Sequence, residues 1–155
     1  MTNNDVLRRL RYAFDIKDSK MIEIFSLGDQ EVTRAEVSQW LKKDDDPDFK
    51  NCSDKLMASF LNGLIVKNRG PRDGEPMVAE KRINNNIILK KLKIALDLKS
   101  EDVLDTLKLS DFRLSKNELS AFFRKTDHKH FRPCMDQVLR NFLEGLKIRH
   151  REGEE

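Results

Sequence analysis

"NNDVLRRLRYAFDIK", residues 3–17, recurs later in the chain as "NNIILKKLKIALDLK", residues 85–99. Shifting the sequence by 82 positions aligns residues 3–69 with residues 85–151 without a gap, and 21 of the 67 aligned pairs are identical. An ungapped similarity of that length indicates an internal duplication. The sequence therefore predicts a first helical repeat at residues 3–69 and a second at residues 85–151.

The segment between the repeats has a different composition. "GPRDGEPMVAEKRIN", residues 70–84, holds two of the six glycines and two of the four prolines of the chain. Gly and Pro mark turns and loops. We therefore predict that residues 70–84 are a linker.

Each repeat is predicted to contain four helices. Apolar residues recur at helical spacing in the first and fourth of them, as in Val6, Leu7, Leu10, Ala13 and Phe14. The third opens with a capping box, Thr33 with Glu36 and Ser115 with Glu118. No segment alternates like a strand. The predicted fold is all-α, two tandem copies of a small four-helix domain with a helix-turn-helix-like second and third helix.

Two glycines occupy the same point of the fourth helix in both repeats. Gly63 and Gly145 each cost a helix about 1 kcal/mol relative to Ala. Their presence at aligned positions predicts that another helix packs closely against the backbone there.

Composition indicates in which cellular compartment the protein is expected and whether it contacts a membrane. Charged residues make up 37% of the 155, well above the usual quarter. No apolar run is long enough to span a bilayer, and "MTNNDVLRRL" lacks the apolar core of a signal peptide. Two cysteines make no disulfide framework. We expect a cytoplasmic protein that does not contact a membrane.

The repeated openings occur together with "VTRAEVSQWLKKDDDPDF" (residues 32–49) and "LSKNELSAFFRKTDHKHFRPC" (residues 114–134). Taken together, these phrases resemble the YehS-like proteins, a bacterial family of duplicated domains of unknown function. The resemblance covers residues 3–151. It implies a small cytoplasmic bacterial protein built from two copies of one domain, and it brings neither catalytic residues nor an established activity.

The second and third predicted helices suggest contact with nucleic acid. "VTRAEVSQW" and "LSKNELSAF" resemble the turn and recognition-helix start of phage-repressor-type helix-turn-helix domains, although the turn is about three residues longer here. Arg, Gln and Asn side chains can bond guanine or adenine edges. The outward-facing candidates are Arg34 and Gln39 in the first repeat and Lys116, Asn117, Ser120 and Arg124 in the second. Whether the longer turn allows entry into a DNA groove stays open.

Charge favours the second repeat for this role. Residues 3–69 carry no net charge, whereas residues 85–151 carry a net charge of +6. The cations that follow the predicted recognition helix are Lys125, Lys129 and Arg132, and they add to the candidate site. The matching loop of the first repeat, "KKDDDPDF", would repel phosphate. A merely solvated charged surface is the alternative explanation.

A second hypothesis is a helical adaptor for a protein partner. Asp5 and Tyr12 of the first repeat are replaced by Ile87 and Ile94 in the second, which widens the apolar face of that helix. A changed core, contact between the repeats or a dimer seam would each explain it. The oligomeric state is left open.

Metal binding, reactive thiols and catalysis have less support in the sequence. "DHKHFRPC" places His128 and His130 near Cys134, but structural zinc sites need four closely paired ligands. Cys52 and Cys134 precede the fourth helices, where a thiol is either activated by the helix or simply buried. No glycine loop or nucleophile elbow is present. We predict no enzyme, no catalytic residue, no cofactor and no metal site.

Overall fold

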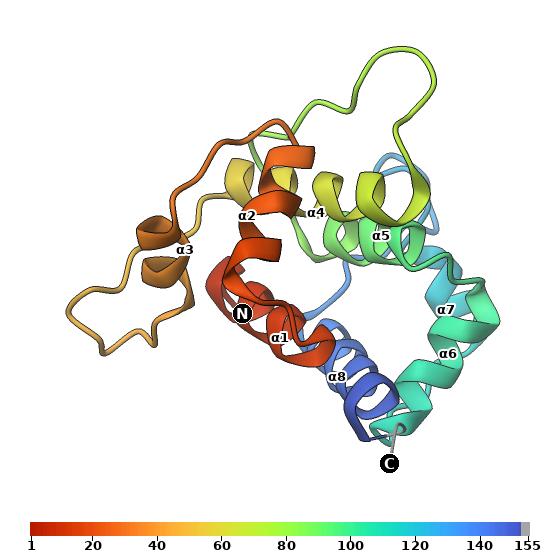
Figure 1. The fold of residues 1–155 in the computed structure, drawn as a ribbon. Helices are drawn as coiled ribbons and strands as arrows, with labels where there is room; N and C mark the ends of the chain where they lie inside the picture. Colours follow the sequence, from red (N-terminus) through yellow and green to blue (C-terminus); the bar gives the residue numbers. More distant parts are fainter. Residues whose placement is uncertain (153–155) are drawn as a thin grey trace.

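The computed structural model describes residues 1–152. In that range all regular secondary structure is helical, and no strand is present. The first repeat forms α1 (Asn3–Phe14), α2 (Asp18–Leu27), α3 (Arg34–Leu41) and α4 (Asp54–Arg69). The second forms α5 (Asn85–Ala95), α6 (Ser100–Leu109), α7 (Lys116–Ala121) and α8 (Asp136–Lys147), followed by the π-helical turn η1 (Ile148–Glu152). The predicted fold class is confirmed (Figure 1).

Both predicted capping boxes are present. In α3 the Thr33 Oγ1 accepts the Glu36 N–H at 3.1 Å, and the Glu36 carboxylate accepts the Thr33 N–H at 2.9 Å. In α7 the Ser115 Oγ and the Glu118 carboxylate exchange the same bonds at 3.1 and 3.0 Å. These bonds pair two backbone donors that have no partner inside the helix, which fixes where each helix begins.

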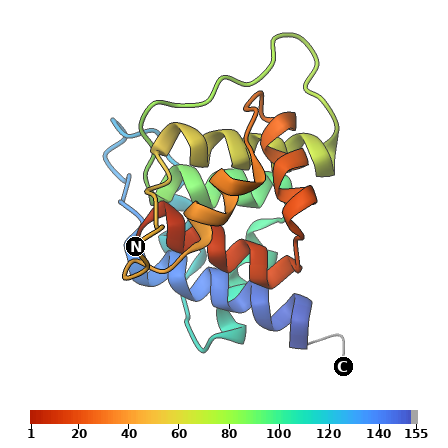
Figure 2. The same cartoon turned by 60° about the vertical axis from the view of Figure 1, so that its left-hand side comes forward.

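The two repeats pack crosswise around one shared core. Helix α1 of the first repeat lies against α8 of the second, and α5 of the second lies against α4 of the first. Figures 1 and 2 show these four helices together, and in Figure 1 α2 and α3 lie to one side of them and α6 and α7 to the other. Buried apolar side chains from both repeats form one continuous cluster. Each repeat therefore covers the apolar face of the other.

Contacts of the repeats with each other and with the residues that precede them occur in matched pairs, 82 residues apart. The Ile83 N–H donates to Asp54 Oδ2 at 3.1 Å, and the amino group of Met1 contacts Asp136 Oδ2 at 2.6 Å. At the other end, Arg69 pairs with Asp97 at 2.6 Å, and Arg151 pairs with Asp15 at 3.8 Å. The duplication in the sequence is thus an approximate two-fold symmetry in space.

A buried asparagine secures the start of each repeat. The Asn4 carboxamide donates to the carbonyl oxygens of Trp40 and Lys50 and accepts the Cys52 N–H. Asn86 makes the same three bonds in the second repeat, to Phe122, Arg132 and Cys134 at 2.9–3.0 Å. One side chain thereby joins the first helix, the end of the third helix and the loop that leads to the fourth.

Glycines allow close crossing of the second and fourth helices. A Cβ on Gly63 would overlap the carbonyl oxygen of Ile24, and one on Gly145 would overlap that of Thr106. The predicted close approach of another helix is confirmed. Where the first repeat has Gly28 at this crossing, the second has Ser110, whose Oγ donates to the Asn141 carbonyl at 2.9 Å.

We expect Asn86→Ala to lower the free energy of unfolding by roughly 2–4 kcal/mol, because it leaves two buried backbone groups and one partly buried carbonyl without partners. Urea unfolding measured by circular dichroism tests this. Asn117→Ala, at an exposed position of α7, is the control and should change stability by no more than about 0.5 kcal/mol. Equal effects of the two substitutions would contradict the role assigned to Asn86.

Gly63→Ala should destabilise the fold by about 1–3 kcal/mol, although Ala is the better helix former, because the new methyl group overlaps the α2 backbone. Ser19→Ala, on the exposed side of α2, serves as the control. Thermal unfolding of both variants tests the prediction. A rise in melting temperature for Gly63→Ala would show that the helices do not cross closely at this point.

Candidate nucleic-acid interface

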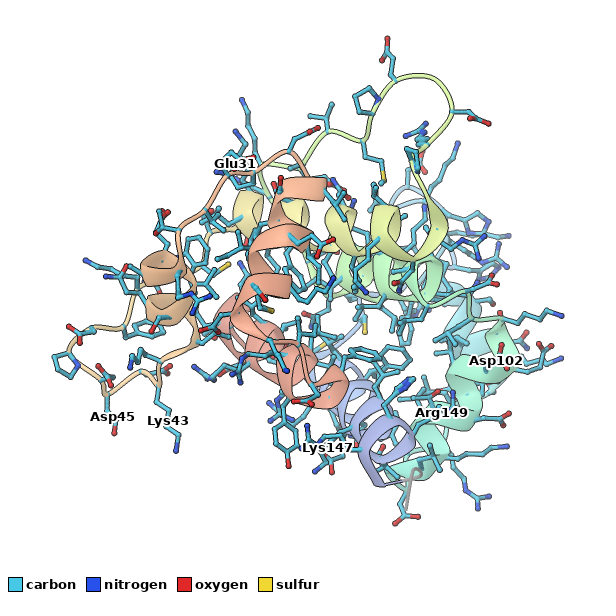
Figure 3. All side chains as sticks on the ribbon, in the orientation of Figure 1. Glu31, Lys43, Asp45, Asp102, Lys147 and Arg149 are labelled. Carbon is cyan, nitrogen blue, oxygen red and sulfur yellow. The ribbon has the colours of Figure 1, made fainter. Side chains whose placement is uncertain are left out.

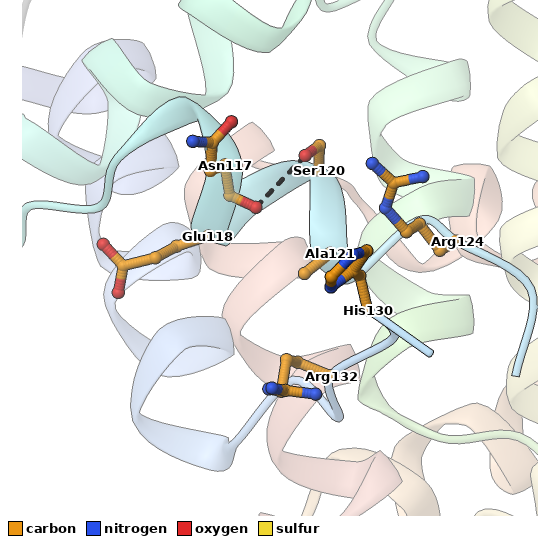
Figure 4. Close-up of a pocket in the computed structure, with 7 residues that line it drawn as sticks. All are labelled: Asn117, Glu118, Ser120, Ala121, Arg124, His130 and Arg132. Carbon is orange, nitrogen blue, oxygen red and sulfur yellow. Dashed lines mark hydrogen bonds between the residues drawn. The ribbon is translucent and has the colours of Figure 1, made fainter. Parts of the chain in front are cut away.

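Four of the predicted site residues line one open hollow of about 450 Å³ in the second repeat. Asn117 and Ser120 come from α7, whereas Arg124 and Arg132 come from the loop at residues 122–135. Figure 4 shows the two guanidinium groups on either side of His130, which also lines the hollow. Residues 15 positions apart in sequence thus present cationic and amide groups to the same space.

Local bonds give the loop the shape that brings Arg132 beside α7. The Arg132 N–H donates to the Ala121 carbonyl at 3.1 Å, and its own carbonyl accepts from Asn86. The His128 Nδ1 accepts the His130 N–H at 3.0 Å, which tightens the turn between them. Buried Phe122 anchors the end of α7. The backbone of the hollow is therefore fixed while its charged side chains stay exposed.

A second hollow of about 420 Å³ adjoins the first and shares Ser120 and Arg124 with it. Its other cations are Lys90 and Lys93 of α5, and Lys93 Nζ lies 5.6 Å from the centre of the Phe123 ring. We call the two hollows together the basic groove. Four cationic side chains from two segments line it, with Glu118 as the single carboxylate among the lining residues.

Other predicted residues lie outside the basic groove. Lys116 is exposed and pairs with Glu101 of α6 at 3.5 Å. Lys125 and Lys129 are exposed on the loop but line neither hollow. Arg34 and Gln39 lie on α3, on the opposite side of the molecule from α7 in Figure 1.

The corresponding surface of the first repeat has different charges. Asp48 stands where the second repeat has His130, and Lys50 where it has Arg132. The acidic run Asp44–Asp46 lies in the same loop, and Figure 3 shows Lys43 and Asp45 extending from it. The two loops share their turn, because the Asp46 carboxylate accepts the Asp48 N–H at 2.8 Å as His128 accepts that of His130.

In the second repeat this turn is formed by the histidine-rich motif. His128 uses Nδ1 within the loop, and Cys134 is buried with its backbone N–H bonded to Asn86. Across residues 1–152, no group of three or more His, Cys, Asp or Glu side chains is placed to hold a metal ion. From the sequence His130 is a candidate metal ligand only, whereas the structure places it in the basic groove. The alignment of His130 with Asp48, close to Lys50, is the feature of the sequence that could have indicated this place.

The two isoleucines proposed as an interface have different surroundings. Ile87 is half-buried, whereas Ile94 is 43% exposed and lines the second hollow of the basic groove. The repeats contact each other through α1 with α8 and α4 with α5. Ile94 therefore adds an apolar patch beside the cations.

Both cysteines are buried. Burial, reinforced by the carboxylate of Asp54, raises the pKa of Cys52 to about 12, and burial with Asp136 does the same for Cys134. A thiol with such a pKa is not ionised near neutral pH and is a poor nucleophile. Burial therefore favours a packing role for both cysteines over a role as reactive thiols.

Comparison with known proteins places the chain in a family. Residues 3–70 and 85–152 each match the family described as "Protein of unknown function (DUF1456)", and the chain belongs to that family. It is 45% identical over 150 residues, 96% of each chain, to "Uncharacterized protein YehS" of Escherichia coli (strain K12). No solved structure matches it.

None of the helices formed by residues 1–152 is long and apolar enough to traverse a bilayer.

The burial of the thiols makes a direct prediction. At about pH 8.5, where a free thiol is half ionised, iodoacetamide should leave both cysteines of the folded chain unmodified. The chain unfolded in guanidinium chloride should be modified at Cys52 and Cys134 on the same timescale. Mass spectrometry of intact protein distinguishes the two. Rapid modification of the folded chain would mean that the thiols are accessible.

Proposed function

We propose that this protein is a non-enzymatic binding module whose second repeat binds nucleic acid through the basic groove. The observation that supports the proposal is the convergence of Lys90, Lys93, Arg124 and Arg132 around Ser120. The one carboxylate of the lining, Glu118, is occupied by the Ser115 N–H in the capping box. Positive charge gathered in this way suits a phosphate backbone.

Backbone contact is favoured over base reading. Helix α7 has six residues and a length of about 9 Å, so few of its side chains can reach base edges in a major groove. Guanidinium groups bind phosphate oxygens with two parallel bonds, which positions the protein without reading sequence. Asn117 and Ser120 add polar groups beside them. We expect binding that tolerates many sequences.

The first repeat is expected to contribute less. Its aligned loop carries Asp44–Asp46 and Asp48, which repel phosphate. The predicted contacts of Arg34 and Gln39 would have to come from a separate surface, since α3 lies away from the basic groove. They remain a prediction that Arg34→Glu tests.

A protein partner is the second candidate, and the exposure of Ile94 favours it. An exposed aliphatic side chain among cations suits an acidic peptide with an apolar anchor. Such binding would weaken with salt less steeply than nucleic-acid binding, and it would be lost in Ile94→Asp, with Ile87→Asp as the companion variant. Nucleic-acid binding would instead weaken steeply as salt rises.

The nucleic-acid proposal predicts that Arg124→Glu/Arg132→Glu weakens binding at least tenfold. It should also lower the slope of log affinity against log salt by about 2, one for each lost phosphate contact. Fluorescence anisotropy with labelled random duplex DNA and single-stranded RNA, between about 50 and 200 mM salt, measures both quantities.

The matched control is Lys42→Glu/Lys50→Glu, which makes the same charge reversals at the aligned positions of the first repeat. It should retain most of the affinity. Absence of binding at low salt, or an equal loss in the two double variants, would refute a site in the second repeat. Circular dichroism verifies that each variant is folded.

A further inference from the structure

A separate hollow lies beneath the linker, on the first repeat. It is about 230 Å³ in volume, and its walls come from the end of α2, from α4 and from residues 71–77. Figures 1 and 2 show the linker arching over this side of the molecule. Its polar lining groups belong to Asn62, Arg72 and Asp29, and Leu27, Val66 and Met77 contribute apolar surface.

The linker is held in place at its second half. Ile83 donates to Asp54, and Glu80 pairs with Lys91 of α5 at 3.1 Å. Met77 and Ile83 pack against the core. The roof of the hollow is therefore attached to both α4 and α5, while residues 71–76 are exposed to solvent above it.

Asn62, which lines this hollow, carries an unpaired donor. Its side chain is buried, with 2% of the residue exposed, and its Oδ1 accepts from Lys91 Nζ at 2.6 Å. Because an ammonium can only donate, Oδ1 must face Lys91, and this fixes the orientation of the amide. The Nδ2 group then has no hydrogen-bond partner among residues 1–152. A buried donor of this kind is costly unless an acceptor binds it.

The second repeat has no such donor. Its aligned residue is Glu144, which pairs with Lys147 at 2.8 Å. The unpaired amide is thus particular to the repeat that the linker covers.

The other polar groups define what complements the amide. Arg72 and Asp29 are exposed and carry opposite charges. A ligand that satisfies all three polar groups offers a carboxylate to Asn62 and Arg72 and a cation to Asp29. The remaining wall is aliphatic, and the volume is below the usual range of drug-sized pockets, about 300–1,000 Å³.

We propose that this hollow binds a small aliphatic α-amino acid, with its carboxylate on Asn62 Nδ2 and Arg72, its ammonium on Asp29 and its side chain against Leu27, Val66 and Met77. The site lies on the first repeat and is independent of the nucleic-acid proposal.

Titration of the isotope-labelled full-length chain with L-valine tests the site by NMR. The side-chain amide signals of Asn62 should shift and saturate, together with the backbone amides of Val66 and Met77. Valinamide, which lacks the carboxylate, and isobutyrate, which lacks the ammonium, should bind at least tenfold more weakly. Signals that stay in place up to about 20 mM, well beyond a millimolar Kd, would overturn the proposal.

Asn62→Asp is the decisive variant. It keeps an acceptor for Lys91 but replaces the unpaired donor by a second acceptor, so the fold should persist and valine affinity should fall at least tenfold. Asp29→Asn removes the partner of the ammonium and suits the positive φ of 63° at this position, because Asn tolerates that conformation. Asn51→Asp, exposed in the loop before α4, is the matched control. If L-valine shifts the signals of Val66 and Met77 in Asn62→Asp as it does in the unmodified chain, the site is also refuted.

Discussion

The buried carboxamides of Asn4 and Asn86 hold together the part of each repeat that has no regular structure. The loops at residues 42–53 and 122–135 are long for helix connections and must find partners for their backbone groups outside any helix. Each asparagine supplies two donors and one acceptor to the ends of its loop. The basic groove depends on this constraint, because the bond from Asn86 to the Arg132 carbonyl sets where that residue lies relative to α7.

Crosswise packing makes the two repeats one structural unit. Since α1 lies on α8 and α5 on α4, unfolding of either repeat exposes the apolar face of a helix in the other. This coupling restricts change in the core, where Phe60 and Phe142 occupy aligned and fully buried positions. The loops and the linker are free of that restriction. Differences between the repeats are therefore concentrated on the surface, as Asp48 and His130 illustrate.

The sequence predicted the helices and the close helix crossings because these depend on local patterns. Capping boxes at Thr33 and Ser115, and glycines at aligned positions, act through neighbouring backbone groups. The crosswise arrangement could not be predicted, because α1 and α5 have similar apolar faces and either can pack on α4 or α8. For the candidate site, charge favoured the second repeat, where the cations of the basic groove lie. It could not separate Arg124 from Lys116, because only the fold brings Glu101 beside Lys116.

The asymmetry of the surface follows from a duplication that must keep one core. An approximate two-fold axis gives every surface feature a counterpart, so a new binding surface can arise in one repeat while the other preserves the shared packing. In the second repeat His128 and His130 replace the acidic Asp46 and Asp48 of the first without altering the turn that both loops use. The linker breaks the symmetry in a second way, because it forms a hollow with the first repeat beside Asn62, where the second repeat has the ion pair of Glu144 with Lys147. The shared core constrains the buried residues of both repeats, whereas the surface of each repeat can change by itself. Two unlike surfaces on one duplicated scaffold follow from this difference.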